Sequence, residues 1–106
     1  MSDVIQIVTT FDNYKLAEKV GEEILSKKLC ACYQIIGPIK SMYWWEGKIE
    51  KKDEWICFIK CEKGRFKDIE ESIKSMHNYE IPEIISFNIS EISESYLIWL
   101  NSVVKS

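Results

Sequence analysis

Hydrophobic spacing changes from strand-like to helical within the first thirty residues. The run DVIQIVTTF, residues 3–11, is rich in β-branched side chains and predicts a first strand. Asp12 is the predicted N-cap of a helix of about 16 residues, because apolar side chains recur after it at helical spacing. The predicted apolar stripe of this helix consists of Leu16, Ala17, Val20, Ile24 and Leu25.

A long hairpin is predicted next. Its first strand begins at residue 30 or 31 and runs to 45, with a bend at Gly37-Pro38, because proline cannot donate to a sheet ladder. Glycine can adopt the positive φ of a reversal, so Glu46-Gly47-Lys48 is the preferred turn, with Lys51-Lys52-Asp53 as the alternative. The return strand runs to about Lys60. Fully extended, the first strand would span roughly 50 Å, so the hairpin bends sharply or projects.

Two features of this hairpin indicate more than one buried surface. The adjacent Trp44 and Trp45 must point to opposite faces, because successive side chains of a strand alternate. The return segment WICFI, residues 55–59, has no polar alternation, which predicts burial on both faces.

The second half of the chain continues the mixed pattern. A helix from about Gly64 to Met76 and a strand from Glu83 to Ile89 are predicted. A last helix has apolar residues around much of its surface, at Tyr96, Leu97, Trp99, Leu100, Val103 and Val104. The order β-α-β-β-α-β plus a C-terminal helix predicts one α+β domain, residues 1–106, of the ferredoxin-like type.

This topology has a consequence for assembly. A four-stranded sheet of this kind carries its two helices on one face, so a sheet that is apolar on both faces leaves one face without cover from its own chain. A patch of that size is typical of an interaction surface. The pattern therefore predicts an obligate homo-oligomer.

Charge and composition narrow the function classes. A net charge of −3 with a single arginine, Arg65, argues against nucleic-acid partners, which need clustered basic residues. No apolar run reaches the roughly 20 residues of a membrane span, and no secretory leader is recognised, so we expect no membrane partner and a cytoplasmic protein. The four cysteines are then expected to be reduced thiols.

Three blocks of the sequence resemble one known family. They are ACYQIIGPIKSMYWWEGKIE in the hairpin, HNYEIPEI after the second helix, and YLIWL in the last helix. In order and over nearly the whole chain they look like the CutA family of divalent cation tolerance proteins. The resemblance implies a non-enzymatic homotrimer, similar in architecture to the PII signalling proteins, with long hairpins that reach neighbouring subunits.

The resemblance also implies copper(II) or another divalent cation as ligand and no organic cofactor. The family site is described around a cysteine at the end of the first strand and histidines at the start of the HPYE-type loop. Those positions fall on Thr9, Met76 and His77, so only His77 matches. A copper(II) ion prefers several N or O ligands, so Glu83 is added as an oxygen ligand. Cys32 is added as a soft ligand, suited to copper(I). A capping or surface role for His77 and a buried thiol role for Cys32 are the alternatives.

A second candidate site is a cleft between subunits. Its candidate lining residues are Tyr43, Trp45, Lys60, Tyr79 and Trp99. Aromatic residues at an obligate interface need no ligand to explain them. The alternative function is a PII-like regulatory trimer that senses a small anion or nucleotide in such clefts.

Overall fold

The structure is a computed structural model that describes residues 3–104, so the first two and last two residues of the predicted domain lie outside it. Within this range the chain forms a four-stranded antiparallel sheet in the order β2-β3-β1-β4. The elements are β1 (Val4–Phe11), α1 (Tyr14–Ser26), β2 (Cys32–Trp45), β3 (Lys48–Glu62), a 3-10 turn (Lys63–Arg65), α2 (Phe66–Met76), β4 (Ile84–Asn88) and α3 (Glu94–Val103). The predicted ferredoxin-like fold is confirmed.

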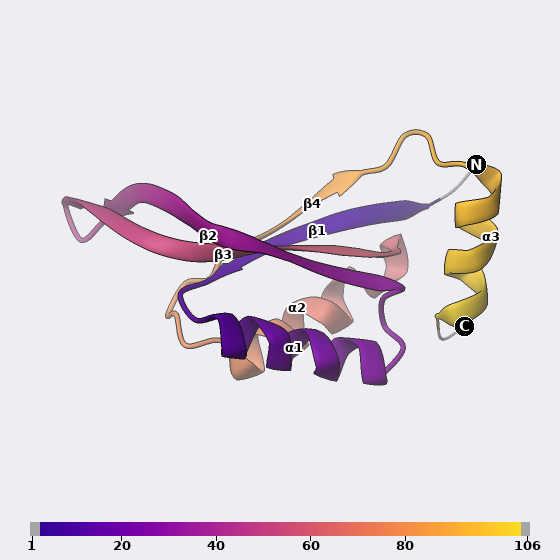
Figure 1. The fold of residues 1–106 in the computed structure, drawn as a ribbon, viewed down its shortest axis with the longest axis horizontal. Coiled ribbons are helices and arrows are strands. Elements are labelled where there is room, and N and C mark those ends of the chain that lie inside the picture. The colour runs from indigo at the N-terminus through magenta and orange to yellow at the C-terminus, as the bar shows by residue number, and fades with distance from the viewer. Residues whose placement is uncertain (1–2, 105–106) are drawn as a thin grey trace.

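Helices α1 and α2 lie side by side on one face of the sheet, and α3 lies at the end of the sheet where β1 begins (Figure 1). In α3, Leu100 packs against Val4 and Ala31. The same helix leaves Ile98 and Trp99 exposed, so within one chain only one of its sides is covered.

The face of the sheet under α1 and α2 forms the main core, which we call the helix face. The Tyr33 ring lies close to α1 there, and its hydroxyl donates to the Ala17 carbonyl at 2.7 Å. A Cβ on Gly21 would lie only 2.5 Å from this ring. Glycine at position 21 therefore lets the ring pack against α1. The buried hydrophobic residues of this core are Ile5, Ile7, Phe11, Ala17, Val20, Ile24, Leu29, Cys30, Cys57, Ile59, Cys61, Ile69 and Ile73.

Helix α1 differs from the prediction at both ends. Its N-cap is Asn13, whose side chain accepts from the Leu16 amide at 2.9 Å, so the predicted cap at Asp12 is wrong by one residue. Both residue types cap helices well, and the sequence alone did not separate them. The helix has 13 residues, shorter than expected, and Leu25 in its last turn is exposed.

The hairpin agrees with its predicted landmarks. The ladder between β2 and β3 is irregular at Ile36/Ile39, around the cis Gly37-Pro38 peptide. The turn lies at Glu46-Gly47, both with positive φ, between the paired Trp45 and Lys48. The hairpin projects beyond the helices, in a chain that measures 44 Å along its longest axis (Figure 1).

The opposite side of the sheet is only partly covered. Neighbouring strands bring Ile36, Ile56, Phe58, Ile85 and Phe87 to this side, and we call these five residues the open face. Ile36 is 51% exposed and Phe87 57% exposed, while Ile56 and Phe58 are half-buried. The predicted burial of β3 on both faces is therefore not reached within one chain.

Candidate functional site

A pocket of about 660 Å³ lies between the hairpin and the loop that joins α2 to β4. The hairpin supplies one wall, and the loop supplies the other. The lining residues are Thr10, Ser41, Met42, Tyr43, Trp45, Glu50, Lys52, Glu54, Asn78, Tyr79, Glu80, Ile81, Pro82 and Glu83.

Strand register explains why the hairpin wall is polar and aromatic. Tyr43 pairs with Glu50, and Ser41 pairs with Lys52, so these four side chains share one face of the hairpin. Trp45 is on the same face, whereas Trp44 points the other way and is 73% exposed. The two adjacent tryptophans therefore serve different surfaces, as strand alternation predicted.

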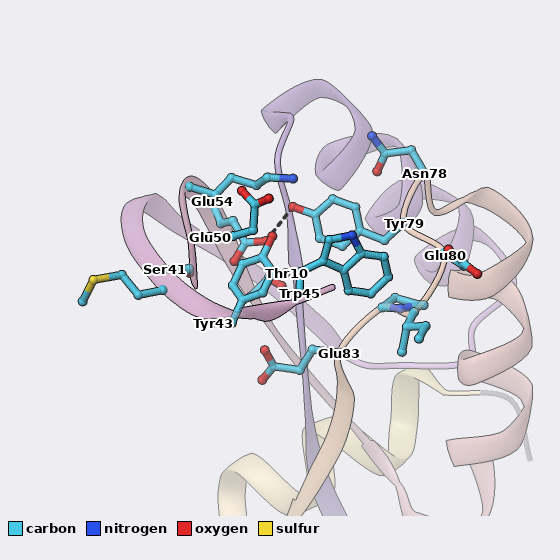
Figure 2. A pocket seen from close by; sticks show the side chains of 14 residues that line it. Thr10, Ser41, Tyr43, Trp45, Glu50, Glu54, Asn78, Tyr79, Glu80 and Glu83 are labelled. Atoms are coloured by element: carbon cyan, nitrogen blue, oxygen red, sulfur yellow. Dashed lines mark hydrogen bonds between the residues drawn. The ribbon is translucent and has the colours of Figure 1, made fainter. Parts of the chain in front are cut away.

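The two walls are joined by one short hydrogen bond. The Tyr79 hydroxyl donates to Glu54 Oε2 at 2.5 Å, and the Glu54 residue is only 4% exposed (Figure 2). Burial, followed by the contact with this carboxylate, raises the pKa of Tyr79, so its hydroxyl stays protonated and keeps donating. Lys52 Nζ lies 4.8 Å from the centre of the Tyr79 ring, at a cation–π distance.

Acidic side chains dominate the charge of the pocket. Glu50, Glu54, Glu80 and Glu83 line it, against a single lysine. Burial and then the charge of Glu54 raise the pKa of Glu83 above its ordinary value. The pocket therefore favours a positively charged ligand.

His77 lies behind this pocket and does not line it. Its Nδ1 accepts from the Tyr79 amide at 3.0 Å, so Nε2 carries the proton and donates to the Thr10 carbonyl at 2.7 Å. The ring stacks on Phe11 with centroids 4.3 Å apart. Burial lowers the pKa of His77, which favours the neutral ring that this hydrogen-bond pattern needs. Both nitrogens therefore hold backbone groups in place.

The three predicted metal ligands do not meet within one chain. Cys32 pairs with Lys60, which pairs with Gln6, whereas His77 contacts Thr10, about 13 Å further along β1. Glu83 lines the pocket, but among residues 3–104 no group of three or more His, Cys, Asp or Glu side chains is arranged to hold a metal ion. To bind a metal, His77 would have to release one of its backbone partners.

The family copper positions also fit poorly in this chain. Thr9 is completely buried, and its Oγ1 has no hydrogen-bond partner. Met76 packs against the main core. A buried hydroxyl, a core thioether and a fully bonded imidazole do not form the set of N and O donors that copper(II) prefers.

The cleft between subunits stays a prediction, but three of its five candidate residues lie together in one chain. Tyr43, Trp45 and Tyr79 all line the pocket. Within one chain the other two candidates lie elsewhere: Lys60 donates to Gln34 Oε1 at 2.6 Å, and Trp99 contacts Tyr96 on α3.

Sequence reasoning missed the acidic wall of the hairpin. Glu50 and Glu54 alternate with Lys51 and Asp53, so the segment reads as an ordinary charged loop or edge strand. The signal was the even spacing of Glu50, Lys52 and Glu54. These residues fall on the Trp45 side only once the turn is fixed at Gly47.

Comparisons with known proteins agree with this fold over most of the chain. The family model described as CutA1 divalent ion tolerance protein matches residues 5–103. The divalent-cation tolerance protein CutA of Pyrococcus horikoshii is 36% identical over 97 residues, which cover 92% of this chain and 94% of that protein. Protein CutA 1, chloroplastic, of Oryza sativa is 34% identical over 92% of this chain and 55% of its own length.

A solved structure has the same fold. The periplasmic divalent cation tolerance protein CutA from Archaeoglobus fulgidus superposes with a TM-score of 0.93 at 34% identity. The superposition covers 96% of this chain and 99% of that one.

Proposed function

The chain belongs to the CutA1 family of divalent ion tolerance proteins, and we propose that it binds a divalent cation through the carboxylates of its pocket, as a non-enzymatic homotrimer. The observation that carries the cation-binding part is the pair Glu54 and Glu83. Both line the pocket, and burial, followed by the charge of Glu54, raises the pKa of Glu83, so a bound cation would stabilise the ionised carboxylate. Carboxylate oxygens are suitable ligands for divalent cations.

The number of protein ligands sets the expected coordination. Because no group of three or more acidic, histidine or cysteine ligands is arranged for a metal in the described range, one chain would supply at most two carboxylates. The remaining positions would be filled by water, as is common for oxygen-bound divalent ions. We therefore expect modest affinity from each chain.

Copper(II) is the expected ion among the first-row metals. At a site of given N or O ligands, affinity rises towards copper and falls again at zinc. The preference for copper(II) that the family resemblance implies is thus expected even though Thr9 and Met76 replace family ligands. The order of affinities should be copper(II) above zinc above manganese(II).

Isothermal titration calorimetry with the three metals tests this proposal. Glu83→Gln should weaken copper(II) binding at least about tenfold, because it removes one of two charged ligands. Glu91→Gln, an exposed glutamate outside the pocket, is the matched control and should bind as the wild type does. Equal affinity in wild type and Glu83→Gln would remove the pocket from metal binding.

Electron paramagnetic resonance of the copper(II) complex tests the identity of the donors. Two glutamates and water predict a spectrum without nitrogen superhyperfine splitting. Such splitting, lost in His77→Gln, would instead support His77 as a ligand. In the optical absorption spectrum of the same complex, a thiolate charge-transfer band that is lost in Cys32→Ser would support Cys32.

The homotrimer is proposed from the open face. Its side chains Ile36, Ile85 and Phe87 form an apolar area that is exposed in one chain, and Val8 lies buried among them. Further copies of the chain can cover this apolar area through heterologous contacts, which close into a ring when the rotation between subunits allows it. The number three comes from the family resemblance.

A non-enzymatic role agrees with the chemistry of the reactive side chains. Burial raises the pKa of Cys30 and Cys61 to about 12 and that of Cys57 to about 11, so these thiols are not nucleophiles near neutral pH. The single histidine has both ring nitrogens bonded to backbone. No residue of the pocket pairs a nucleophile with a histidine base.

The cytoplasm is the proposed compartment, because all four cysteines are free thiols, which is typical of a reducing environment. No helix in residues 3–104 is long and apolar enough to span a membrane. Two relatives are described as belonging to other compartments, one as chloroplastic and one as periplasmic. Cell fractionation checks the proposal, and recovery outside the cytosolic fraction would contradict it.

The PII-like alternative has less support from this pocket. A sensor of small anions or nucleotides needs basic groups to meet phosphate or carboxylate charge. Here a single Lys52 stands among four glutamates. Thermal stabilisation by a nucleotide at micromolar concentration, with none from copper(II), would favour the sensor.

A further inference from the structure

The pocket contains more than carboxylates. Three aromatic side chains, Tyr43, Trp45 and Tyr79, lie next to the acidic groups, and Figure 2 shows their rings gathered at the centre of the lining. A metal ion bound by oxygen needs no aromatic wall. Aromatic rings beside carboxylates are instead suited to organic cations, whose charge and apolar body are both recognised.

The protein itself supplies evidence that a ring of this pocket accepts a cation. The Lys52 ammonium lies 4.8 Å from the centre of the Tyr79 ring and 3.9 Å from the Asp12 carboxylate. An ammonium group on an alkyl chain is thus already held by one ring face and one carboxylate. The rings of Tyr43 and Trp45 lie in the same pocket, and among residues 3–104 no cation lies over either ring.

The carboxylates form two sets on different elements. Glu50 and Glu54 belong to β3, whereas Glu80 and Glu83 belong to the loop that leads into β4. In the view of Figure 2 the indole of Trp45 lies between the carboxylates of Glu54 and Glu80. Carboxylates therefore line the pocket from both walls, together with the three aromatic rings.

We infer that the pocket binds an organic diammonium ion, an aliphatic chain with one ammonium group at each end. One ammonium would be held by the β3 carboxylates, the methylene chain would lie against Trp45, and the second ammonium would meet Glu80. A pocket of about 660 Å³ is within the usual size range for small-ligand sites. The inference uses the same pocket as the proposed metal site but does not depend on bound metal.

Calorimetric titration of the metal-free protein with 1,4-diaminobutane, n-butylamine and 1,4-butanediol tests the inference. The diammonium should bind about tenfold more tightly than the monoamine, because only it reaches both acidic sets, and the neutral diol should not bind measurably. Equal affinity for diamine and monoamine would overturn the inference, as would the absence of diamine binding.

Two adjacent tryptophans provide a matched pair of variants. Trp45→Leu should weaken diammonium binding about threefold to tenfold, whereas Trp44→Leu, on the opposite face of the hairpin, should leave it unchanged. Glu80→Gln, at an exposed position, should reduce the affinity for the diamine to that for the monoamine. An equal loss in both tryptophan variants would contradict the inference, and circular dichroism checks that each variant is folded.

The two proposals for this pocket fail separately. Trp45→Leu should not alter copper(II) affinity, because the indole is not a ligand. Copper(II) binding without diamine binding would overturn the present inference and leave the proposed function standing. Diamine binding that depends on Trp45, without copper(II) binding, would do the reverse.

Discussion

The two faces of the sheet differ most clearly at adjacent residues of β3. Ile59 is fully buried beneath α1 and α2, whereas Phe58, one residue earlier, is on the open face and only half-buried. Both are large and apolar, and the sequence gives no sign that their surroundings differ. Apolar character therefore shows that a side chain needs cover, but not whether the cover comes from the same chain.

The hairpin repeats this contrast on a smaller scale. Trp45 faces an acidic, aromatic pocket, and Trp44 pairs with Ile49 on a surface that the chain leaves exposed. One side of the hairpin thus lines the proposed ligand pocket. The other side has the apolar character of a contact surface.

The largest expected effect is a loss of stability at the helix face. Ile59→Ala should lower the free energy of unfolding by about 2–5 kcal/mol, because it leaves a cavity in a closed core, while Ile59→Val should cost about 0.5–1.5 kcal/mol. Denaturant unfolding at a fixed protein concentration measures both. A loss below about 1 kcal/mol for Ile59→Ala would mean that this face is not the tightly packed one.

A smaller effect is expected where His77 closes the end of the helix face. Its pKa in the folded protein should lie below the ordinary 6.5, because the ring is buried between Phe11 and Tyr79. When the pH is below 6.5 but above the folded pKa, His77 is mostly protonated in the unfolded chain and mostly neutral in the folded one. Stability from this residue is therefore complete above about pH 6.5 and is lost as the pH falls through the folded pKa.

Nuclear magnetic resonance of the sole histidine measures this directly, and nitrogen shifts should report a neutral ring protonated at Nε2. A titration midpoint of His77 at or above pH 6.5 would contradict a buried ring with both nitrogens hydrogen-bonded. Glu83 titrates with the opposite sign, since its raised pKa favours protonation in the folded state. Comparison with His77→Gln isolates the histidine contribution.

Much of the fold was predictable because local signals agreed with one another. The positive φ at Gly47, the irregularity at Gly37-Pro38 and the helical spacing of α2 each depend on near neighbours in the sequence. The exact cap of α1 was missed because Asp12 and Asn13 are equivalent by residue type. The exposure of Leu25 depends on where the helix ends against the rest of the protein.

The site was predictable only in part, because it depends on contacts between distant segments. Tyr43, Trp45, Tyr79 and Glu83 were identified as candidates, but nothing local indicated that Tyr79 would donate to Glu54. The two backbone partners of His77 also come from fold geometry, since Thr10 is 67 residues away in the sequence. His77, a candidate ligand in the sequence, has both ring nitrogens hydrogen-bonded to the backbone in the fold.

The central claim is that copies of this chain cover the open face, and sedimentation velocity at low micromolar concentration tests it most directly. The wild type should sediment with three times the mass of one chain. Phe87→Asp, which adds a charge to the open face, should sediment as a folded smaller species, whereas Ser86→Asp on the other side of β4 should assemble normally. A folded wild-type monomer, or unchanged assembly of Phe87→Asp, would contradict the account.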